Sequence, residues 1–85
     1  MALIDVTANG NYPDDTGVSL TGDHVFRLQN PNGATVNLQV RIGDEWDTIP
    51  NGTFSAIITK LLHCGEGLTL RANVTGFVSA FSFEW

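Results

Sequence analysis

The stretch Thr35-Val36-Asn37-Leu38-Gln39-Val40-Arg41-Ile42 shows the pattern on which the fold depends. Apolar and polar residues alternate strictly from Val36 to its end. Because successive side chains of a β-strand point to opposite faces, this alternation predicts a strand with one buried face and one exposed face. The following Gly43-Asp44-Glu45 predicts a tight reversal into a second strand that begins at Trp46.

Working outward from this stretch, the same two-residue period recurs along most of the chain. No stretch has apolar residues at helical spacing over three turns. Turn-forming residues separate the alternating segments, including a loop at residues 12–17 and Asn30-Pro31-Asn32-Gly33, where Asn-Gly favours positive φ. We expect strands at residues 3–8, 18–20, 24–29, 35–42, 46–49, 54–60, 68–75 and 77–85. The fold class predicted for residues 1–85 is therefore a single all-β domain, an antiparallel sandwich or small barrel of about seven or eight short strands.

The apolar members of these strands define the expected core. They are Phe26 and Leu28; Val36, Leu38, Val40 and Ile42; Leu68, Leu70, Ala72 and Val74; and Phe77, Phe81, Phe83 and Trp85. A chain of 85 residues buries only roughly 60–65% of its unfolded surface, so such a core is marginal. With Cys64 as the only cysteine, an internal disulfide is impossible. Oligomerisation or docking onto a larger body is the expected source of further stability.

Charge and composition exclude several classes of partner. The net charge is −5, and Arg27, Arg41, Lys60 and Arg71 are the four basic residues. An acidic chain offers no basic surface for duplex nucleic acid and is repelled by anionic lipid. The N-terminus leads directly into a polar stretch, so we expect neither a signal peptide nor a transmembrane span.

Residue patterns that announce catalysis or metal binding are missing from the sequence. None of the serines lies in a Gly-x-Ser-x-Gly elbow, and His63 and Cys64 are adjacent, which places them on opposite faces of a strand. The acidic turns at residues 14–15 and 44–47 lack the spacing of an EF-hand and are expected to be solvated. We therefore expect no enzymatic activity, no cofactor and no metal site.

Polar residues on three of the predicted strands suggest a docking face. Arg27 and Gln29, then Asn37, Gln39 and Arg41, then Thr69, Arg71, Asn73 and Thr75 alternate with core positions. If these strands are neighbours, three of the four basic residues gather on one sheet face, and arginine is favoured at protein interfaces. The alternative is an ordinary solvated sheet surface. The residues proposed for docking are Arg27, Asn37, Gln39, Arg41 and Arg71.

A longer succession of motifs resembles a known group of proteins. It runs from Val25-Phe26-Arg27-Leu28-Gln29 through Gly33-Ala34-Thr35-Val36-Asn37-Leu38-Gln39 and a Gly-Asp turn leading to Trp46, and ends at Leu70-Arg71-Ala72-Asn73-Val74 followed by Gly76. This succession, over residues 22–85, resembles the small β-sandwich virion proteins of tailed bacteriophages. Two segments depart from the pattern: the turn at residues 64–67 is longer, and the loop at residues 12–17 has no counterpart.

The resemblance implies a capsid decoration (cement) protein or a similar head accessory. Such a protein binds the major capsid protein on the outer surface of the virion in many copies, often as homotrimers, and stabilises the shell. A second interpretation is a carbohydrate-binding or host-recognition module of a phage neck, tail or fibre. That module would use Trp46, Tyr12 and the acidic turn at residues 44–47.

Overall fold

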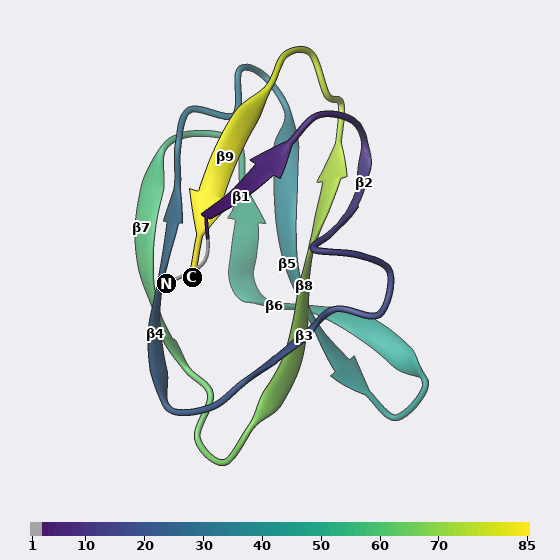
Figure 1. Ribbon diagram of the computed structural model, residues 1–85, viewed down its shortest axis with the longest axis vertical. Helices are drawn as coiled ribbons and strands as arrows, with labels where there is room; N and C mark the ends of the chain where they lie inside the picture. Colours follow the sequence, from purple (N-terminus) through teal and green to yellow (C-terminus); the bar gives the residue numbers. More distant parts are fainter. Residues whose placement is uncertain (1–2) are drawn as a thin grey trace.

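The computed structural model describes residues 3–85 and is all-β: two antiparallel sheets, of four and five strands, pack as a sandwich (Figure 1). The described residues form nine strands and no helix. The strands are β1 (Leu3–Val6), β2 (Gly10–Tyr12), β3 (Val18–Leu20), β4 (Asp23–Leu28), β5 (Thr35–Ile42), β6 (Glu45–Phe54), β7 (Ile58–His63), β8 (Leu68–Thr75) and β9 (Phe81–Glu84). The predicted fold class is confirmed. Residues 3–85 contain no helix of the length and apolarity that crossing a membrane would require.

The chain passes repeatedly from one sheet to the other. The four-stranded sheet has the order β1-β9-β4-β7, and the five-stranded sheet has the order β2-β8-β5-β6, with β3 also paired to β8. The connection at residues 29–34 carries the chain from β4 in the first sheet to β5 in the second. Its turn follows the sequence prediction, since Asn32 and Gly33 have φ of 56° and 93°. This crossing decides which polar side chains share a face.

Strands β3, β5 and β8 have the predicted bounds, whereas β6 and β7 differ from the prediction. Pro50-Asn51-Gly52 was expected to end one strand and start another at residue 54, but β6 continues to Phe54. The pairing with β5 shifts from Asn37↔Thr53 to Gln39↔Thr48, so residues 49–52 bulge out of the ladder. A proline fits at such a bulge because it has no N–H to donate to a neighbouring strand.

Strand β2 lies in a segment for which the sequence predicted no strand. It pairs with β8 through Gly10↔Val74 and Tyr12↔Ala72. The Tyr12 hydroxyl donates to the carbonyl oxygen of Ala8 at 2.7 Å and accepts from the Ala8 N–H at 3.1 Å. The pairing with β8 and the hydrogen bonds of the Tyr12 hydroxyl therefore hold this segment as a strand. Its three residues are too few for an alternating pattern to be recognised in the sequence.

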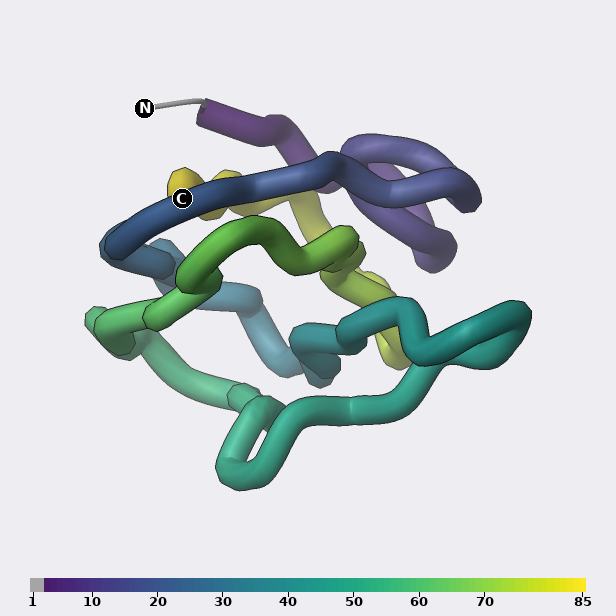
Figure 2. The backbone as a smooth tube through the Cα atoms, turned by 90° about the horizontal axis from the view of Figure 1, so that it is seen from below, coloured from purple at the N-terminus to yellow at the C-terminus, as the bar shows by residue number. Residues whose placement is uncertain are grey.

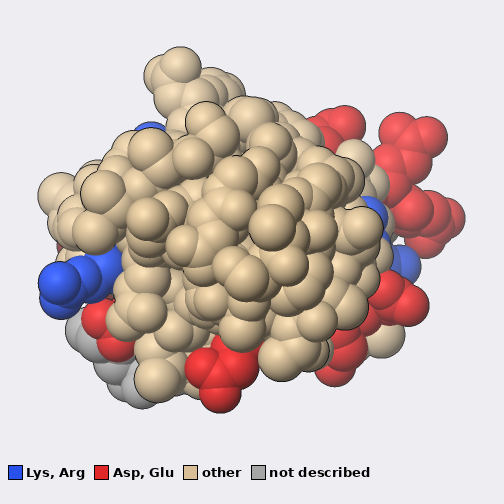
Figure 3. Space-filling view, turned by 90° about the horizontal axis from the view of Figure 1, so that it is seen from above, with Lys and Arg blue, Asp and Glu red and all other residues tan. Residues whose placement is uncertain are grey.

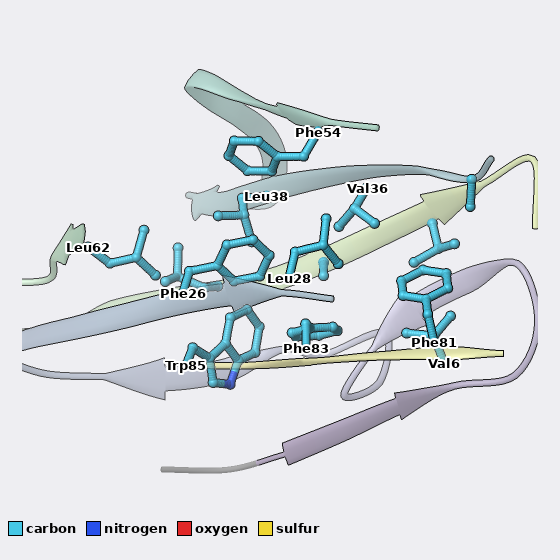
Figure 4. Close-up of a cluster of buried hydrophobic side chains, with 14 of the residues drawn as sticks. Val6, Phe26, Leu28, Val36, Leu38, Phe54, Leu62, Phe81, Phe83 and Trp85 are labelled. Atoms are coloured by element: carbon cyan, nitrogen blue, oxygen red, sulfur yellow. The ribbon is translucent and has the colours of Figure 1, made fainter. Parts of the chain in front are cut away.

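The core lies between the sheets, where Phe26 is the centre of an aromatic cluster (Figure 4). Its ring centroid is 5.6 Å from those of Phe54 and Phe83 and 6.4 Å from that of Trp85. Each large apolar side chain buried in this way contributes roughly 1.5–3 kcal/mol. The buried apolar residues are Val6, Phe26, Leu28, Ala34, Val36, Leu38, Phe54, Leu62, Cys64, Leu70, Ala72, Val74, Phe81, Phe83 and Trp85.

Four residues predicted for the core lie at its margin or outside it, and the first of them, Val40, is half-buried against the core. Ile42 is 60% exposed because the β5–β6 hairpin extends beyond the sandwich (Figure 1), and Leu68 is 39% exposed at the start of β8. Phe77 precedes β9, is half-buried and stacks on Phe81 with a centroid distance of 6.4 Å. Seen from below along the long axis, the tip of the β5–β6 hairpin projects from one side of the body (Figure 2).

Candidate docking surface

The outer surface of the five-stranded sheet is built almost entirely from amide, hydroxyl and guanidinium side chains. Alternation along β5 and β8 buries one set of residues and turns the other set away from the core. Strands β2, β3 and β6 add residues that lie opposite these in register. We call this surface the polar face; it comprises Asn11, Ser19, Thr35, Asn37, Gln39, Arg41, Trp46, Thr48, Thr53, Thr69, Arg71, Asn73 and Thr75.

A row of amides crosses four strands of the polar face. The register places Asn11 opposite Asn73, Asn73 opposite Asn37, and Asn37 opposite Thr53. The Asn73 Nδ2 donates to Asn11 Oδ1 at 2.9 Å, and the Thr53 hydroxyl donates to Asn37 Oδ1 at 2.8 Å. Each amide carries two N–H donors and a two-lone-pair acceptor, so these bonds orient the groups without using all their capacity.

Arg71 is held in the next row by three contacts. Its Nε donates to Gln39 Oε1 at 2.7 Å, its guanidinium carbon lies 4.3 Å from the centroid of the Trp46 ring, and a terminal nitrogen donates to the Asp15 carbonyl at 3.5 Å. A guanidinium stacked on an aromatic ring loses little further freedom when it binds a carboxylate. The polar face therefore presents a half-buried, oriented cation.

Arg41 lies towards the tip of the β5–β6 hairpin and is less constrained. Its Nε donates to the Gly43 carbonyl at 3.0 Å, and a terminal nitrogen is 3.8 Å from Asp44 Oδ1. Both side chains are well exposed, so this ion pair contributes at most about 1 kcal/mol. Arg41 is thus on the polar face, but its charge is partly balanced by its neighbour.

Arg27 does not lie on the polar face, which corrects the prediction that three arginines gather there. It belongs to β4, in the other sheet, where it is exposed and pairs in register with Thr59 and Glu84. Alternation distinguishes an inward from an outward side chain, but it carries no information on which sheet a strand joins. Of the predicted docking residues, the fold brings together Asn37, Gln39, Arg41 and Arg71 and leaves Arg27 on the opposite surface.

Several polar-face residues were not predicted from the sequence. Asn11 lies between the strand predicted at residues 3–8 and the loop predicted at residues 12–17, and Thr53 lies between the strands predicted at residues 46–49 and 54–60. Ser19 faces Thr69, and their hydroxyl oxygens are 3.3 Å apart. A three-residue strand is too short to show a period, so only the pairing with β8 reveals what β2 and β3 contribute.

The aromatic residues considered for sugar binding are already engaged within the domain. Arg71 covers one face of the Trp46 ring. A Cβ on Gly17 would lie 2.7 Å from Trp46 Cη2, so the ring edge packs closely against that backbone. The Tyr12 hydroxyl is bonded to Ala8. Arg71 therefore occupies one of the two Trp46 faces on which a sugar could stack, and the Tyr12 hydroxyl is used within the domain.

His63 and Cys64, the residues considered for catalysis, point to opposite sides of the four-stranded sheet, as predicted. His63 Nδ1 is 3.0 Å from Asp23 Oδ1, and these side chains are 74% and 80% exposed on the outer surface of the four-stranded sheet. Cys64 points inward and is buried. Within residues 3–85, no three His, Cys, Asp or Glu side chains are grouped closely enough to hold a metal ion.

Four side-chain hydrogen bonds link register neighbours on adjacent strands of the polar face. No family model, curated protein or solved structure matches the chain.

A mostly apolar cavity of about 280 Å³ lies at one edge of the sandwich. It is bordered by β6, the edge strand of the five-stranded sheet, and β7, the edge strand of the four-stranded sheet. Ile49, Pro50, Lys60, Leu62, Cys64 and Leu68 are among its lining residues. Burial raises the pKa of the Cys64 thiol, and the negative charge of Asp23 raises it further. The thiol therefore stays protonated at neutral pH.

We expect Cys64 to react slowly with thiol reagents in the folded protein, because only the thiolate is nucleophilic and the sulfur is buried. Labelling with a maleimide at neutral pH should be at least about tenfold slower in buffer than in concentrated urea. Mass spectrometry of timed samples measures both rates. Equal rates would contradict the buried position of the thiol.

Proposed function

We propose that the protein is a structural component of a tailed-bacteriophage virion, which decorates the outer capsid surface and stabilises it by docking its polar face onto the major capsid protein. The motif succession over residues 22–85 supports the assignment to a virion. The oriented rows of the polar face, with Arg71 fixed between Gln39 and Trp46, support the docking role and are the observation on which the proposal rests.

The chemistry of the polar face suits a protein partner. Amides and hydroxyls donate and accept hydrogen bonds, and an arginine fork pairs with a carboxylate in a defined geometry. Groups already held by neighbours lose less conformational entropy on binding than free side chains do. A capsid surface that presents carboxylates and backbone carbonyls to Arg71 and the asparagine row is the partner that fits.

The size of the domain accounts for binding in many copies. Its principal extents are 35 × 25 × 21 Å, so one face offers at most about the 800 Å² per partner of a standard interface. A single such polar contact gives moderate affinity. Copies that are linked to one another and bound to a repeating lattice gain avidity without any new type of contact.

We expect Arg71→Ala to weaken binding to capsids by about tenfold or more, because fully oriented arginines are among the residues that dominate interface energies. The assay is co-sedimentation of the purified protein with empty shells assembled from the major capsid protein encoded with it. Mass spectrometry of complete virions should find hundreds of copies per particle.

Arg27→Ala is the matched control, since it removes the same side chain from the opposite sheet. Its binding should stay within about twofold of the unmodified protein, and thermal melts establish that both variants are folded. A loss confined to Arg27→Ala would move the docking surface to the four-stranded sheet. Absence of the protein from virions would refute the proposed function itself.

A further inference from the structure

The apolar cavity lies where the two sheets of the sandwich are open to one another. β6 and β7 border it, and no strand within residues 3–85 pairs with the outer side of either. A small molecule can therefore enter between the two edge strands without breaking a backbone hydrogen bond. None of the residues that line the cavity belongs to the polar face.

The bulge in β6 helps to shape this cavity. Residues 49–52 leave the ladder with β5, and Ile49 and Pro50 line one wall. Leu62, Cys64 and Leu70, which are buried, line the interior. Unfilled apolar space of this kind costs stability, because its lining side chains lose the contacts of a close-packed interior. An apolar molecule of the right size would restore those contacts.

Lys60 adds a cation to this apolar lining. It alternates along β7 with the exposed Thr59 and Leu61 and lies opposite the fully buried Phe26 in register, so it belongs to the inward face of the strand. Lys60 is half-buried. A lysine in such a place buries its aliphatic stem along apolar surface and keeps its ammonium at the boundary with water.

The charge of Lys60 is not balanced by an ion pair of the described residues. Within residues 3–85, the ion pairs join Arg41 to Asp44 and His63 to Asp23. Viewed from above, the acidic side chains gather mainly at the right, the side to which the β5–β6 hairpin extends, whereas β7 lies on the left (Figures 1 and 3). A chain of net charge −5 thus leaves one cation at the cavity unpaired.

We propose that the cavity binds a small amphipathic anion: a straight-chain carboxylate of medium length, whose alkyl chain fills the cavity and whose carboxylate pairs with Lys60. An apolar pocket that contains few polar groups fixes the orientation of its ligand through those groups. A charge-assisted hydrogen bond to the ammonium supplies that orientation here. Because the cavity is separate from the polar face, this inference is independent of docking to a capsid.

The volume of the cavity sets the length of the alkyl chain. A cavity of about 150 Å³ holds benzene, so 280 Å³ has room for roughly eleven non-hydrogen atoms, between octanoate and decanoate. Each methylene that becomes buried raises affinity about fourfold. The affinity should therefore rise about fifteenfold from hexanoate to octanoate and gain less than about threefold beyond decanoate.

Titration of the isotope-labelled protein with these three carboxylates, followed by two-dimensional NMR below the micelle concentration, tests the proposal. We expect saturable shift changes at the amides of the cavity lining, including Leu62, Cys64 and Leu70, and a dissociation constant of about a millimolar or below for octanoate. Amides of the polar face should be unaffected. Octan-1-ol, which has the same chain without the charge, should bind at least about fivefold more weakly than octanoate.

Lys60→Met removes the cation and keeps an unbranched side chain. It should weaken octanoate binding at least about fivefold and abolish the preference for octanoate over octan-1-ol. Arg27→Met is the matched control, since it removes the same charge from the adjacent strand β4, where the side chain faces outward. Its affinity for octanoate should stay within about twofold, and the NMR spectra establish that both variants are folded.

The proposal is overturned if octanoate causes no saturable shift changes at the cavity lining, or if affinity keeps rising at the same rate beyond decanoate. Equal binding of octanoate and octan-1-ol, with no effect of Lys60→Met, would mean that the cavity accepts uncharged apolar groups and that Lys60 only discourages pairing at the β7 edge. An equal loss in Arg27→Met would reduce the effect to net charge and would also overturn it.

Discussion

Phe26→Ala is expected to destabilise the domain by about 3–5 kcal/mol, the cost typical of emptying a large aromatic site in a core. Phe26 is fully buried and stacks or tilts against Phe54, Phe83 and Trp85, which come from both sheets. Stabilities of small domains are only about 5–15 kcal/mol, so the variant should be largely unfolded in mild denaturant. Urea titration followed by tryptophan fluorescence measures the change.

Val25→Ala is the control for that substitution, because the preceding residue on β4 faces outward and is 36% exposed. Its cost should stay below about 1 kcal/mol, as for most surface changes. A loss below about 1.5 kcal/mol for Phe26→Ala would mean that the aromatic cluster repacks and that Phe26 does not join the two sheets.

Gly17→Ala is expected to destabilise the domain by about 2–4 kcal/mol and to disturb the polar face at the same time. Gly17 has φ of +76°, and an added Cβ would lie 2.6 Å from the Leu70 carbonyl oxygen and 2.7 Å from Trp46 Cη2. The backbone of β8 cannot yield, so the indole must move and its stack with Arg71 is lost. Urea titration gives the stability change, and near-ultraviolet circular dichroism reports the environment of Trp46.

Gly22→Ala separates the two causes of that effect. Gly22 has φ of +72°, nearly the same as Gly17, but an added Cβ would meet nothing within 4 Å. It should therefore cost only the left-handed strain of about 1–2 kcal/mol and leave the tryptophan signal unchanged. Equal effects of the two substitutions would show that the contact between Gly17 and Trp46 has no energetic weight.

The sequence was most informative where a strand is long and lies in the middle of a sheet. Strands β5 and β8 have the predicted bounds because eight alternating residues specify both the extended conformation and the buried side. The same alternation correctly separated Asn37 and Arg71 from the core positions beside them. Long-range pairing then brought these two strands together, as the docking hypothesis required.

What the sequence could not supply was the partner of each strand. Arg27 alternates as regularly as Arg41, yet a six-residue crossing places β4 in the opposite sheet. Pro50 was predicted to end a strand, but it lies in a bulge within β6, which continues to Phe54. Both errors have one physical origin: side-chain period is a local property, whereas pairing and bulges depend on residues far along the chain.

The pairing of β1 with β9 has a consequence for how the protein is made. Leu3 lies opposite Glu84, and Val6 lies opposite Phe81. During synthesis on the ribosome, at about 5–20 residues per second, β1 waits several seconds for its partner strand to be translated. Until then, β4 has β7 on one side and an open edge on the other, so the nascent chain is exposed to misassembly until its last strand emerges.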